Sequence, residues 1–311
     1  MKHARATIDC EARASGFAAA YLRTAGDECA FVECYTNAAV PVLLETLAAA
    51  GRRPEDVRYV VVTHAHLDHA GGASGLMAAC PNATLLAHPR AARHLIDPAK
   101  LVASAKHVYG EARFTELYGV IAPIPEARVR VMEDGATFTL GDATLTTLHT
   151  AGHAKHHFVV HDPATSTVYT GDTFGLVYPH LQRAGTFAFA STTPTDFDAA
   201  EALKSLDRVL ALGEPSVCPT HYGEARDVHR IADQVRRFVE LSEQWVAQAA
   251  ATAAPLSELT GTIQARLREA LDTAARRVGL SLGPSDWAAL ELDVTLNAQG
   301  LAFVADKRRA G

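Results

Sequence analysis

The stretch HAHLDH (64–69) limits what this chain can fold into more than any other part of the sequence. Three histidines and an aspartate occupy six positions, directly after the apolar run RYVVV (58–62) and before Gly71 and Gly72. Such a short apolar run is typical of a strand covered on both faces. A solvated helix cap with Asp68 as the capping residue is the alternative, but a cap needs no histidines. Imidazole and carboxylate both bind borderline divalent metals, so the stretch predicts a metal site at the tip of a buried strand.

Three later segments have the same design, in which a strand ends in a short loop that carries a ligand-type side chain. LHTAGH (148–153) offers His153, VYTGD (168–172) offers Asp172, and VCPTHYG (217–223) offers His221. Each has Thr or Gly beside the ligand, and glycine permits tight turns and a close approach of the backbone. We expect these side chains and those of HAHLDH to converge on one edge of a sheet sandwich.

HAHLDH followed in order by GH, GD and TH resembles the metallo-β-lactamase-fold hydrolases, over roughly residues 18–225. The resemblance implies an α/β fold, a four-layer αββα sandwich with a dinuclear metal site on the open edge of its two sheets. Within that superfamily the pattern is similar to the glyoxalase II-like hydroxyacylglutathione hydrolases, of which this chain would be an outlying branch. Carried over by position, the resemblance assigns one metal to His64, His66 and His153, the second to Asp68, His69 and His221, and a bridging role to Asp172.

The resemblance and the composition of the chain predict its organisation. We expect a catalytic domain over 1–225 with a helical insertion at 89–119, and a helical C-terminal extension over 226–311 that a loop at 279–286 interrupts. An apolar stripe at helical spacing marks the extension (Leu256, Leu259, Ile263, Leu267 and Leu271). Strands are expected at 6–12, 18–26, 28–35, 58–62, 83–88, 128–132, 136–150, 157–162, 166–172 and 215–223, and further helices at 37–51 and 197–213.

The helical insertion carries more basic than acidic side chains. Its basic residues are Arg90, Arg93, Lys100, Lys106 and Arg113, and its acidic residues are Asp97, Glu111 and Glu116. One hypothesis is that 89–119 folds over the metal edge as a lid that favours an anionic substrate. The alternative is a solvated helical hairpin or a dimer surface.

The charge and the cysteine content indicate which binding partners and which cellular compartment to expect. The net charge of −6 and the pI near 6.2 do not favour nucleic acid or an anionic membrane as a partner. No stretch approaches the roughly 20 apolar residues of a membrane span, and the first residues lack the apolar core of a signal peptide. The five cysteines are scattered and form no CxxC pair, which favours a reducing, cytoplasmic setting. We expect a small-molecule substrate and consider a homodimer possible.

The expected cofactor is a pair of divalent metal ions, with zinc favoured and iron or manganese as alternatives. Two such ions lower the pKa of a bridging water from about 15.7 toward about 7, so that a hydroxide can attack a carbonyl at neutral pH. Asp68 could also steer the attacking oxygen and accept its proton. The predicted reaction is hydrolysis of a thioester or ester of an anionic small molecule. The alternatives are a lactonase, a persulfide dioxygenase with one iron ion, a phosphodiesterase, and a non-enzymatic metal-binding protein.

Other histidines and two tyrosines lie near the predicted ligands in the sequence. His157 could orient a ligand, and Tyr178 or Tyr222 could contact substrate or stabilise an oxyanion. His149 and His156 are expected on the opposite strand face or in the loop. A surface position is favoured for the histidines that flank or occupy the insertion (His88, His94 and His107).

Overall fold

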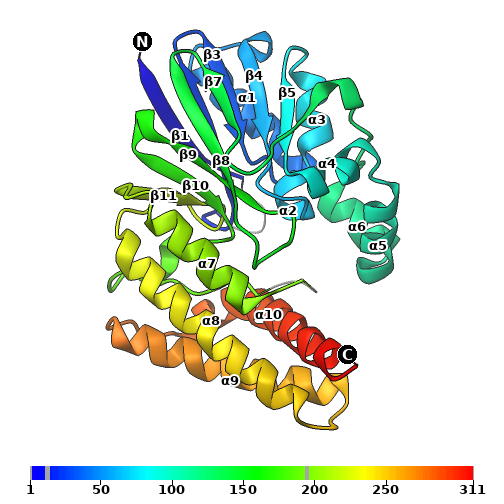
Figure 1. Ribbon diagram of the computed structural model, residues 1–311, viewed down its shortest axis with the longest axis vertical. Helices are drawn as coiled ribbons and strands as arrows, with labels where there is room; N and C mark the ends of the chain where they lie inside the picture. The colour runs from blue at the N-terminus through cyan, green and yellow to red at the C-terminus, as the bar shows by residue number, and fades with distance from the viewer. Residues whose placement is uncertain (1, 11–14, 193–195, 311) are drawn as a thin grey trace. The chain divides into compact units, whose positions relative to one another are not determined.

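The structure of the protein is a computed structural model that describes residues 2–10, 15–192 and 196–310 (Figure 1). The contacts between residues divide the chain into two compact units. Unit 1 comprises 1–149, 156–171 and 216–224, and unit 2 comprises 150–155, 172–215 and 225–311.

Unit 1 contains the two sheets found in the described part of the chain. The first has the strand order β1-β2-β3-β4-β5-β6 and the second β11-β10-β9-β8-β7. Neighbouring strands are antiparallel from β1 to β3 and parallel from β3 to β6, whereas the second sheet is antiparallel except for the parallel pair β10–β11. The strands are β1 (His3–Asp9), β2 (Ala19–Ala25), β3 (Glu28–Val32), β4 (Val57–Val61), β5 (Thr84–Ala87), β6 (Val129–Val131), β7 (Thr137–Leu140), β8 (Ala143–His149), β9 (Phe158–Asp162), β10 (Thr167–Gly171) and β11 (Ser216–Pro219).

One hydrophobic core of unit 1 lies between the two sheets. Successive side chains of a strand point to opposite faces, so that Tyr21 of β2 faces the second sheet and its neighbour Leu22 faces away from it. Aromatic side chains meet edge to face across this core, with ring centroids 5.3 Å apart for Tyr21 and Tyr169 and 5.2 Å for Tyr59 and Phe138. Such pairs contribute about 0.5–1.5 kcal/mol beyond the burial of their area.

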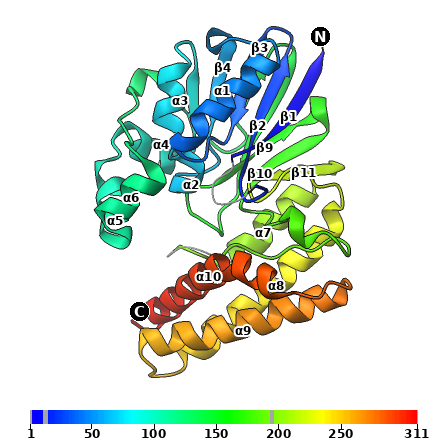
Figure 2. The same cartoon turned by 180° about the vertical axis from the view of Figure 1, so that it is seen from behind.

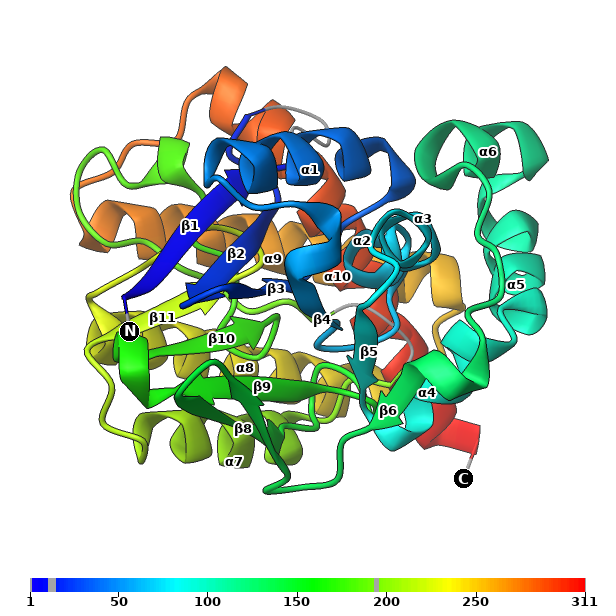
Figure 3. The same cartoon turned by 90° about the horizontal axis from the view of Figure 1, so that it is seen from above.

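A second core of unit 1 joins the outer face of the first sheet to helices. Figures 2 and 3 show α1 and α3 on this face, and Leu43 and Leu47 of α1 pack in the same cluster as Val60 of β4. The strand β4 is therefore covered on both sides, as its apolar sequence predicts. The helices of unit 1 are α1 (Val40–Ala49), α2 (Leu67–Ala70), α3 (Ala73–Ala79), α4 (Pro89–Ile96), α5 (Ala99–Tyr109) and α6 (Glu111–Tyr118).

Unit 2 is helical. Its helix α9 packs along α10, and α8 packs against both α7 and α10. The predicted stripe of α9 is buried at four positions, whereas Leu256 is 43% exposed, because it lies in the first turn of the helix. The helices of unit 2 are α7 (Ala199–Leu210), α8 (Val228–Ala250), α9 (Leu256–Arg277) and α10 (Pro284–Ala310).

The predicted α/β fold, with two sheets and a helical C-terminal region, is confirmed. Several element bounds differ from the prediction. The strand expected at 28–35 ends at Val32, because Glu33 and Tyr35 adopt positive φ angles of 67° and 53°. The segment 136–150 contains the turn signal GD at 141–142, and it forms a hairpin, β7 and β8, that turns at Gly141 with φ 58°. The boundary after residue 225 between a catalytic domain and an extension stays a prediction.

Among the described residues, no helix is both long enough and apolar enough to cross a membrane.

Candidate metal centre

The loop after β4 carries the predicted ligands of the HAHLDH stretch. His64 lies in a bend shortly after β4, His66 has an extended backbone, and α2 begins directly after His66, its N-cap residue. His64 Nε2 lies 2.7 Å from His66 Nδ1, while His64 Nδ1 lies 3.0 Å from Thr63 Oγ1. Because metal–nitrogen bonds are about 2.0–2.1 Å long, two ring nitrogens this close can bind one ion.

Gly72 explains why glycines follow this loop. A Cβ atom on Gly72 would lie 2.6 Å from Cys34 O and 2.7 Å from Thr36 O. Without it, the Gly72 amide donates to Tyr35 O at 2.9 Å and the Cys34 amide donates to His69 O at 3.2 Å. The backbone that follows β3 is thereby held against α2, the helix that carries Asp68 and His69.

Asp68, His69 and His221 form a group with the donor chemistry of a metal site. Their ligand atoms all lie within 4.8 Å of one another. Asp68 Oδ2 is 3.5 Å from His221 Nε2 and 3.8 Å from His69 Nε2. Both rings are buried, whereas the Asp68 side chain is 42% exposed. One carboxylate oxygen and two imidazole nitrogens suit zinc, and iron or manganese accept the same donors.

The ring orientations of His69 and His221 are fixed by acceptors on their other nitrogen. His69 Nδ1 donates to Glu33 Oε2 at 3.0 Å, and His221 Nδ1 donates to Phe17 O at 2.9 Å. Neutral rings with the proton on Nδ1 present Nε2 as the metal-binding atom, and acceptors of this kind are common around metal-bound histidines.

Sequence reasoning missed Glu33. This side chain is 1% exposed, and its Oε1 accepts the Thr63 amide at 3.0 Å while Oε2 accepts His69. It therefore ties the end of β3 to both ends of the histidine loop. A signal was present, since Glu33 is a lone carboxylate directly after the apolar run AFV (30–32).

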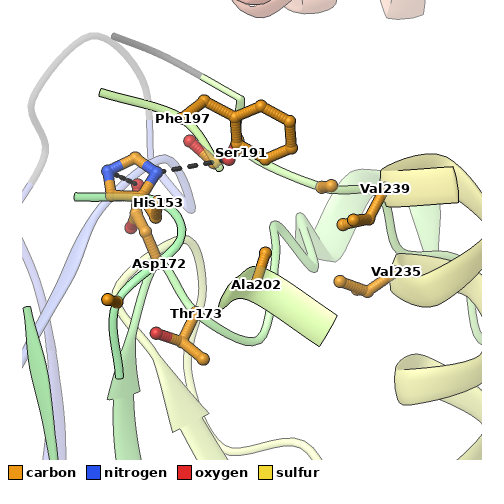
Figure 4. Close-up of a pocket in the computed structure, with 10 residues that line it drawn as sticks. His153, Asp172, Thr173, Ser191, Phe197, Ala202, Val235 and Val239 are labelled. Carbon is orange, nitrogen blue, oxygen red and sulfur yellow. Dashed lines mark hydrogen bonds and ion pairs between the residues drawn. The ribbon is translucent and has the colours of Figure 1, made fainter. Parts of the chain in front are cut away.

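Unit 2 brings together two further predicted ligands, His153 and Asp172 (Figure 4). His153 Nδ1 donates to Ser191 O at 3.2 Å, and His153 Nε2 lies 3.5 Å from Asp172 Oδ2. A Cβ atom on Gly152 would lie 2.3 Å from Ala202 N at the start of α7, so this glycine also permits a close approach. The adjoining pocket has an apolar wall formed by Phe197, Ala202, Val235 and Val239.

His157 lies beside the histidine loop in unit 1. It is 1% exposed, and its ring centroid is 4.9 Å from that of His64. A Cβ atom on Gly171 would lie 2.5 Å from His157 Nε2 and 2.6 Å from Thr63 Oγ1, so Gly171 lets the end of β10 approach both residues. An orienting role for His157 stays a prediction.

The other histidines lie at the end of β8, in the segment between β8 and β9, and in the insertion. His156 lies between β8 and β9, and its ring centroid is 5.3 Å from that of His66. His149 donates from Nε2 to Met132 O at 2.9 Å. His107 is exposed and His94 is half-buried.

The surface position expected for His88 is wrong. His88 is 6% exposed, because its Nδ1 caps α4 by accepting the Arg90 amide at 3.0 Å and its ring lies 4.1 Å from that of His149. The pKa of His88 is lowered to about 3, mainly by burial and to a smaller extent by the neighbouring His149, His156 and Arg90.

Tyr178 and Tyr222 differ in their surroundings. Tyr178 is 2% exposed, and its hydroxyl donates to Asp293 of α10 at 3.1 Å. Tyr222 is half-buried against the core between the sheets, and burial raises the pKa of its hydroxyl. Their substrate contacts stay predictions.

Two of the five basic side chains of the insertion form ion pairs within it. Lys106 Nζ lies 2.8 Å from Glu111 Oε1, and Arg113 Nη1 lies 2.7 Å from Glu116 Oε1. These pairs reduce the positive charge that the segment can offer to an anion. Its role as a lid stays a prediction.

Comparison with known proteins identifies the family. The sequence profile described as the metallo-beta-lactamase superfamily matches residues 15–221, so the chain belongs to this superfamily. The predicted superfamily is confirmed.

The individual relatives share 28% sequence identity with parts of this chain. The chain is 28% identical over 169 residues to a metallo-beta-lactamase fold-containing protein, ST1585, of Sulfurisphaera tokodaii, a match that covers 53% of this chain and 60% of that protein. It is 28% identical over 134 residues to the acyl-coenzyme A thioesterase MBLAC2 of Homo sapiens, which covers 40% of this chain and 42% of the relative. The chain therefore spans less than two thirds of the length of either relative.

Solved structures agree on the fold. The crystal structure of ST1585, from Sulfolobus tokodaii, superposes with a TM-score of 0.65 at 20% identity over 97% of this chain and 99% of that one. The B3 metallo-beta-lactamase BLEG-1 superposes with a TM-score of 0.57 at 17% identity over 76% of this chain and 99% of that one. At these identities the likeness concerns the fold alone.

Proposed function

We propose that this protein is a dinuclear metal-dependent hydrolase that cleaves a thioester or ester of an anionic small molecule. The observation that carries the proposal is the group of Asp68, His69 and His221, in which the Nε2 atoms of both rings lie within 3.8 Å of one Asp68 oxygen. In this proposal these residues hold one metal, His64, His66 and His153 hold the other, and Asp172 bridges them.

Chain connectivity supports the inclusion of Asp172 and His153 in the proposed metal site. Asp172 is joined by a peptide bond to Gly171, and consecutive Cα atoms are about 3.8 Å apart. Gly171 in turn lies against Thr63 and His157, beside the histidine loop. His153 Nε2 lies 3.5 Å from Asp172 Oδ2, so whatever ion Asp172 binds is within reach of His153.

Bound divalent ions would supply a nucleophile derived from water at neutral pH and would polarise the substrate carbonyl. The residues of the chain prepare that chemistry. Glu33 and the carbonyls of Phe17 and Ser191 keep the Nδ1 protons of His69, His221 and His153 in place, so that Nε2 remains available. Asp68, half-exposed among buried rings, would orient the attacking water and take up its proton.

A thioester is the favoured substrate class because relatives in Homo sapiens and Bos taurus are named acyl-coenzyme A thioesterases. Zinc is the favoured metal because the donors are imidazole and carboxylate. A reducing, cytoplasmic setting is consistent with the state of the five cysteines, all of which lie in the described ranges as buried free thiols.

Metal analysis combined with an activity panel tests the proposal. We expect two zinc ions per chain and turnover of thioesters in preference to lactones and phosphodiesters. Asp172→Ala should abolish turnover and lower the metal content, whereas His107→Ala, at an exposed histidine of the insertion, should change neither. One iron ion with oxygen consumption would instead indicate the dioxygenase, and full turnover by Asp172→Ala would refute the bridging assignment.

A further inference from the structure

Asn297 is a buried polar residue of the C-terminal helix α10 that touches the segment beside His153. Its side chain is 3% exposed. Asn297 Oδ1 accepts the Thr192 amide at 2.6 Å and the Thr192 hydroxyl at 3.0 Å, and Nδ2 donates to Ala190 O at 3.5 Å. One amide group therefore holds the backbone on both sides of Ser191.

Ser191 is the residue whose carbonyl receives the Nδ1 proton of His153, at 3.2 Å (Figure 4). The residues of this connection are all buried, with exposed fractions of 9% for Ser191, 1% for Thr192 and 4% for His153. A buried carbonyl that cannot rotate freely sets the direction of the hydrogen bond it accepts, and thus the plane of the imidazole ring.

We propose that Asn297 is a positioning residue, which acts through the Ser191 carbonyl to aim His153 Nε2 at its metal ion. The proposal rests on the proposed function, because it takes His153 to be a metal ligand. It gives α10, which lies outside the family match at 15–221, a part in the metal site. Loss of the Asn297 amide leaves the Thr192 amide without its acceptor and lets the 190–192 segment shift, which turns the ring.

The test uses the whole chain and four variants, two of them at Asn297, with Zn²⁺ and Co²⁺ as the probes. Asn297→Leu keeps the number and branching of the side-chain heavy atoms and removes both hydrogen-bonding atoms, whereas Asn297→Asp keeps an acceptor for the Thr192 amide. We expect Asn297→Leu to raise one of the two Zn²⁺ dissociation constants about 10-fold, measured by competition with a chromophoric chelator, since changes around metal ligands typically weaken affinity by about 10–100-fold. The visible absorption of the Co²⁺-substituted protein should change as well, and Asn297→Asp should restore most of the affinity.

Asp286→Asn is the matched control. Asp286 is another buried polar residue of α10, 6% exposed, and its partners are Arg183 and the Gly283 amide. This variant should lower the melting temperature without changing either Zn²⁺ dissociation constant. If Asn297→Leu also lowers only the melting temperature and leaves the Zn²⁺ affinities and the Co²⁺ spectrum unchanged, the positioning role is refuted.

His153→Ala separates this inference from the proposed function. If His153→Ala weakens Zn²⁺ binding but Asn297→Leu does not, only the role of Asn297 fails. If His153→Ala itself leaves both Zn²⁺ affinities unchanged, the ligand assignment of the proposed function fails, and the inference fails with it.

Discussion

Three histidines of the candidate site share one local arrangement, in which Nδ1 faces an acceptor and Nε2 faces other ligand-type groups. His69 donates to Glu33, His221 to Phe17 O and His153 to Ser191 O. Two of these acceptors are backbone carbonyls, which no substitution removes directly. Glu33 is the exception, and it is a charged group that also raises the basicity of its histidine.

Glu33→Gln should weaken metal binding. The variant keeps the size of the side chain but replaces a carboxylate with a neutral amide, so the hydrogen bond from His69 Nδ1 loses its charge assistance. We expect a loss of about 10–100-fold in Zn²⁺ affinity, measured by chelator competition. Glu55→Gln, at an exposed position of unit 1, is the control, and equal affinities for the two variants would contradict the role of Glu33.

His88 should make the protein less stable in mild acid. Its pKa is about 3 in the folded protein, mainly through burial, against 6.5 in the unfolded chain. In this pH range the unfolded chain binds a proton at His88 and the folded protein does not. The contribution of neutral His88 to the free energy of unfolding is therefore complete above pH 6.5 and is lost as the pH falls from 6.5 toward 3. Protonation at Nδ1 would also break the cap of α4.

The free energy of unfolding measured in urea should show the effect of His88. Between pH 7 and pH 5 it should fall by about 1–2 kcal/mol more in the wild-type protein than in His88→Asn. Asparagine is a good capping residue that does not titrate, so α4 keeps its cap in the variant. Identical pH dependence in the two proteins would show that His88 is not held neutral.

At the scale of elements, close backbone contacts position the ligand loops. Gly72 lets α2 and α3 lie against the loop after β3, and Gly171 lets the end of β10 lie against the histidine loop. At both glycines a Cβ atom would overlap neighbouring atoms. Gly72, which follows HAHLDH, and Gly171, in the GD motif, therefore help to position the loops of the candidate metal site.

Gly72→Ala should destabilise the protein by roughly 1–3 kcal/mol, because the new methyl group would overlap two backbone oxygens that cannot move independently. The measurement is the urea midpoint together with metal content. Gly261→Ala is a matched control, because Gly261 lies within α9 with nothing within 4 Å of a Cβ atom. That substitution should raise stability slightly, since alanine favours helix over glycine.

The buried ion pair between Arg23 of β2 and Asp162 of β9 links the two sheets. Both side chains are fully buried, with Arg23 Nε 2.5 Å from Asp162 Oδ2. Arg23→Ala should lower stability by about 3–5 kcal/mol in urea unfolding, because it leaves the Asp162 charge buried without its cation. Lys204→Ala, which removes an exposed pair with Glu201, should leave the midpoint nearly unchanged. Equal effects would mean that Asp162 is compensated by other groups.

For the whole molecule, metal binding should be coupled to folding. An ion that binds only the folded protein stabilises it by about 2.7 kcal/mol per site at 100 times its dissociation constant. Removal of metal by a chelator should therefore lower the melting temperature, and added Zn²⁺ should restore it in proportion to the logarithm of its concentration. Mg²⁺, which prefers oxygen ligands, should restore little. A melting temperature that does not respond to Zn²⁺ would contradict a folded metal site.

Much of the fold could be predicted from local sequence. The buried strand before HAHLDH, the hairpin at Gly141 and the C-terminal helices follow from apolar periodicity and turn residues within a few positions of each other. The bounds near Glu33 could not, because its positive φ angle follows from the contacts its side chain makes with Thr63 and His69, some 30 residues away.

The sequence alone determined the superfamily, and it predicted the types of the candidate ligands and their order along the chain, because HAHLDH holds four ligand-type side chains within six positions. Tertiary structure alone decided which groups orient those ligands. These groups are distant along the chain from the residues that they position: Glu33, the carbonyls of Phe17 and Ser191, and Asn297. A backbone carbonyl is present at every residue, so the sequence does not show which one accepts a given hydrogen bond. It also decided that His88 is a buried cap, because burial depends on how the chain packs around a residue.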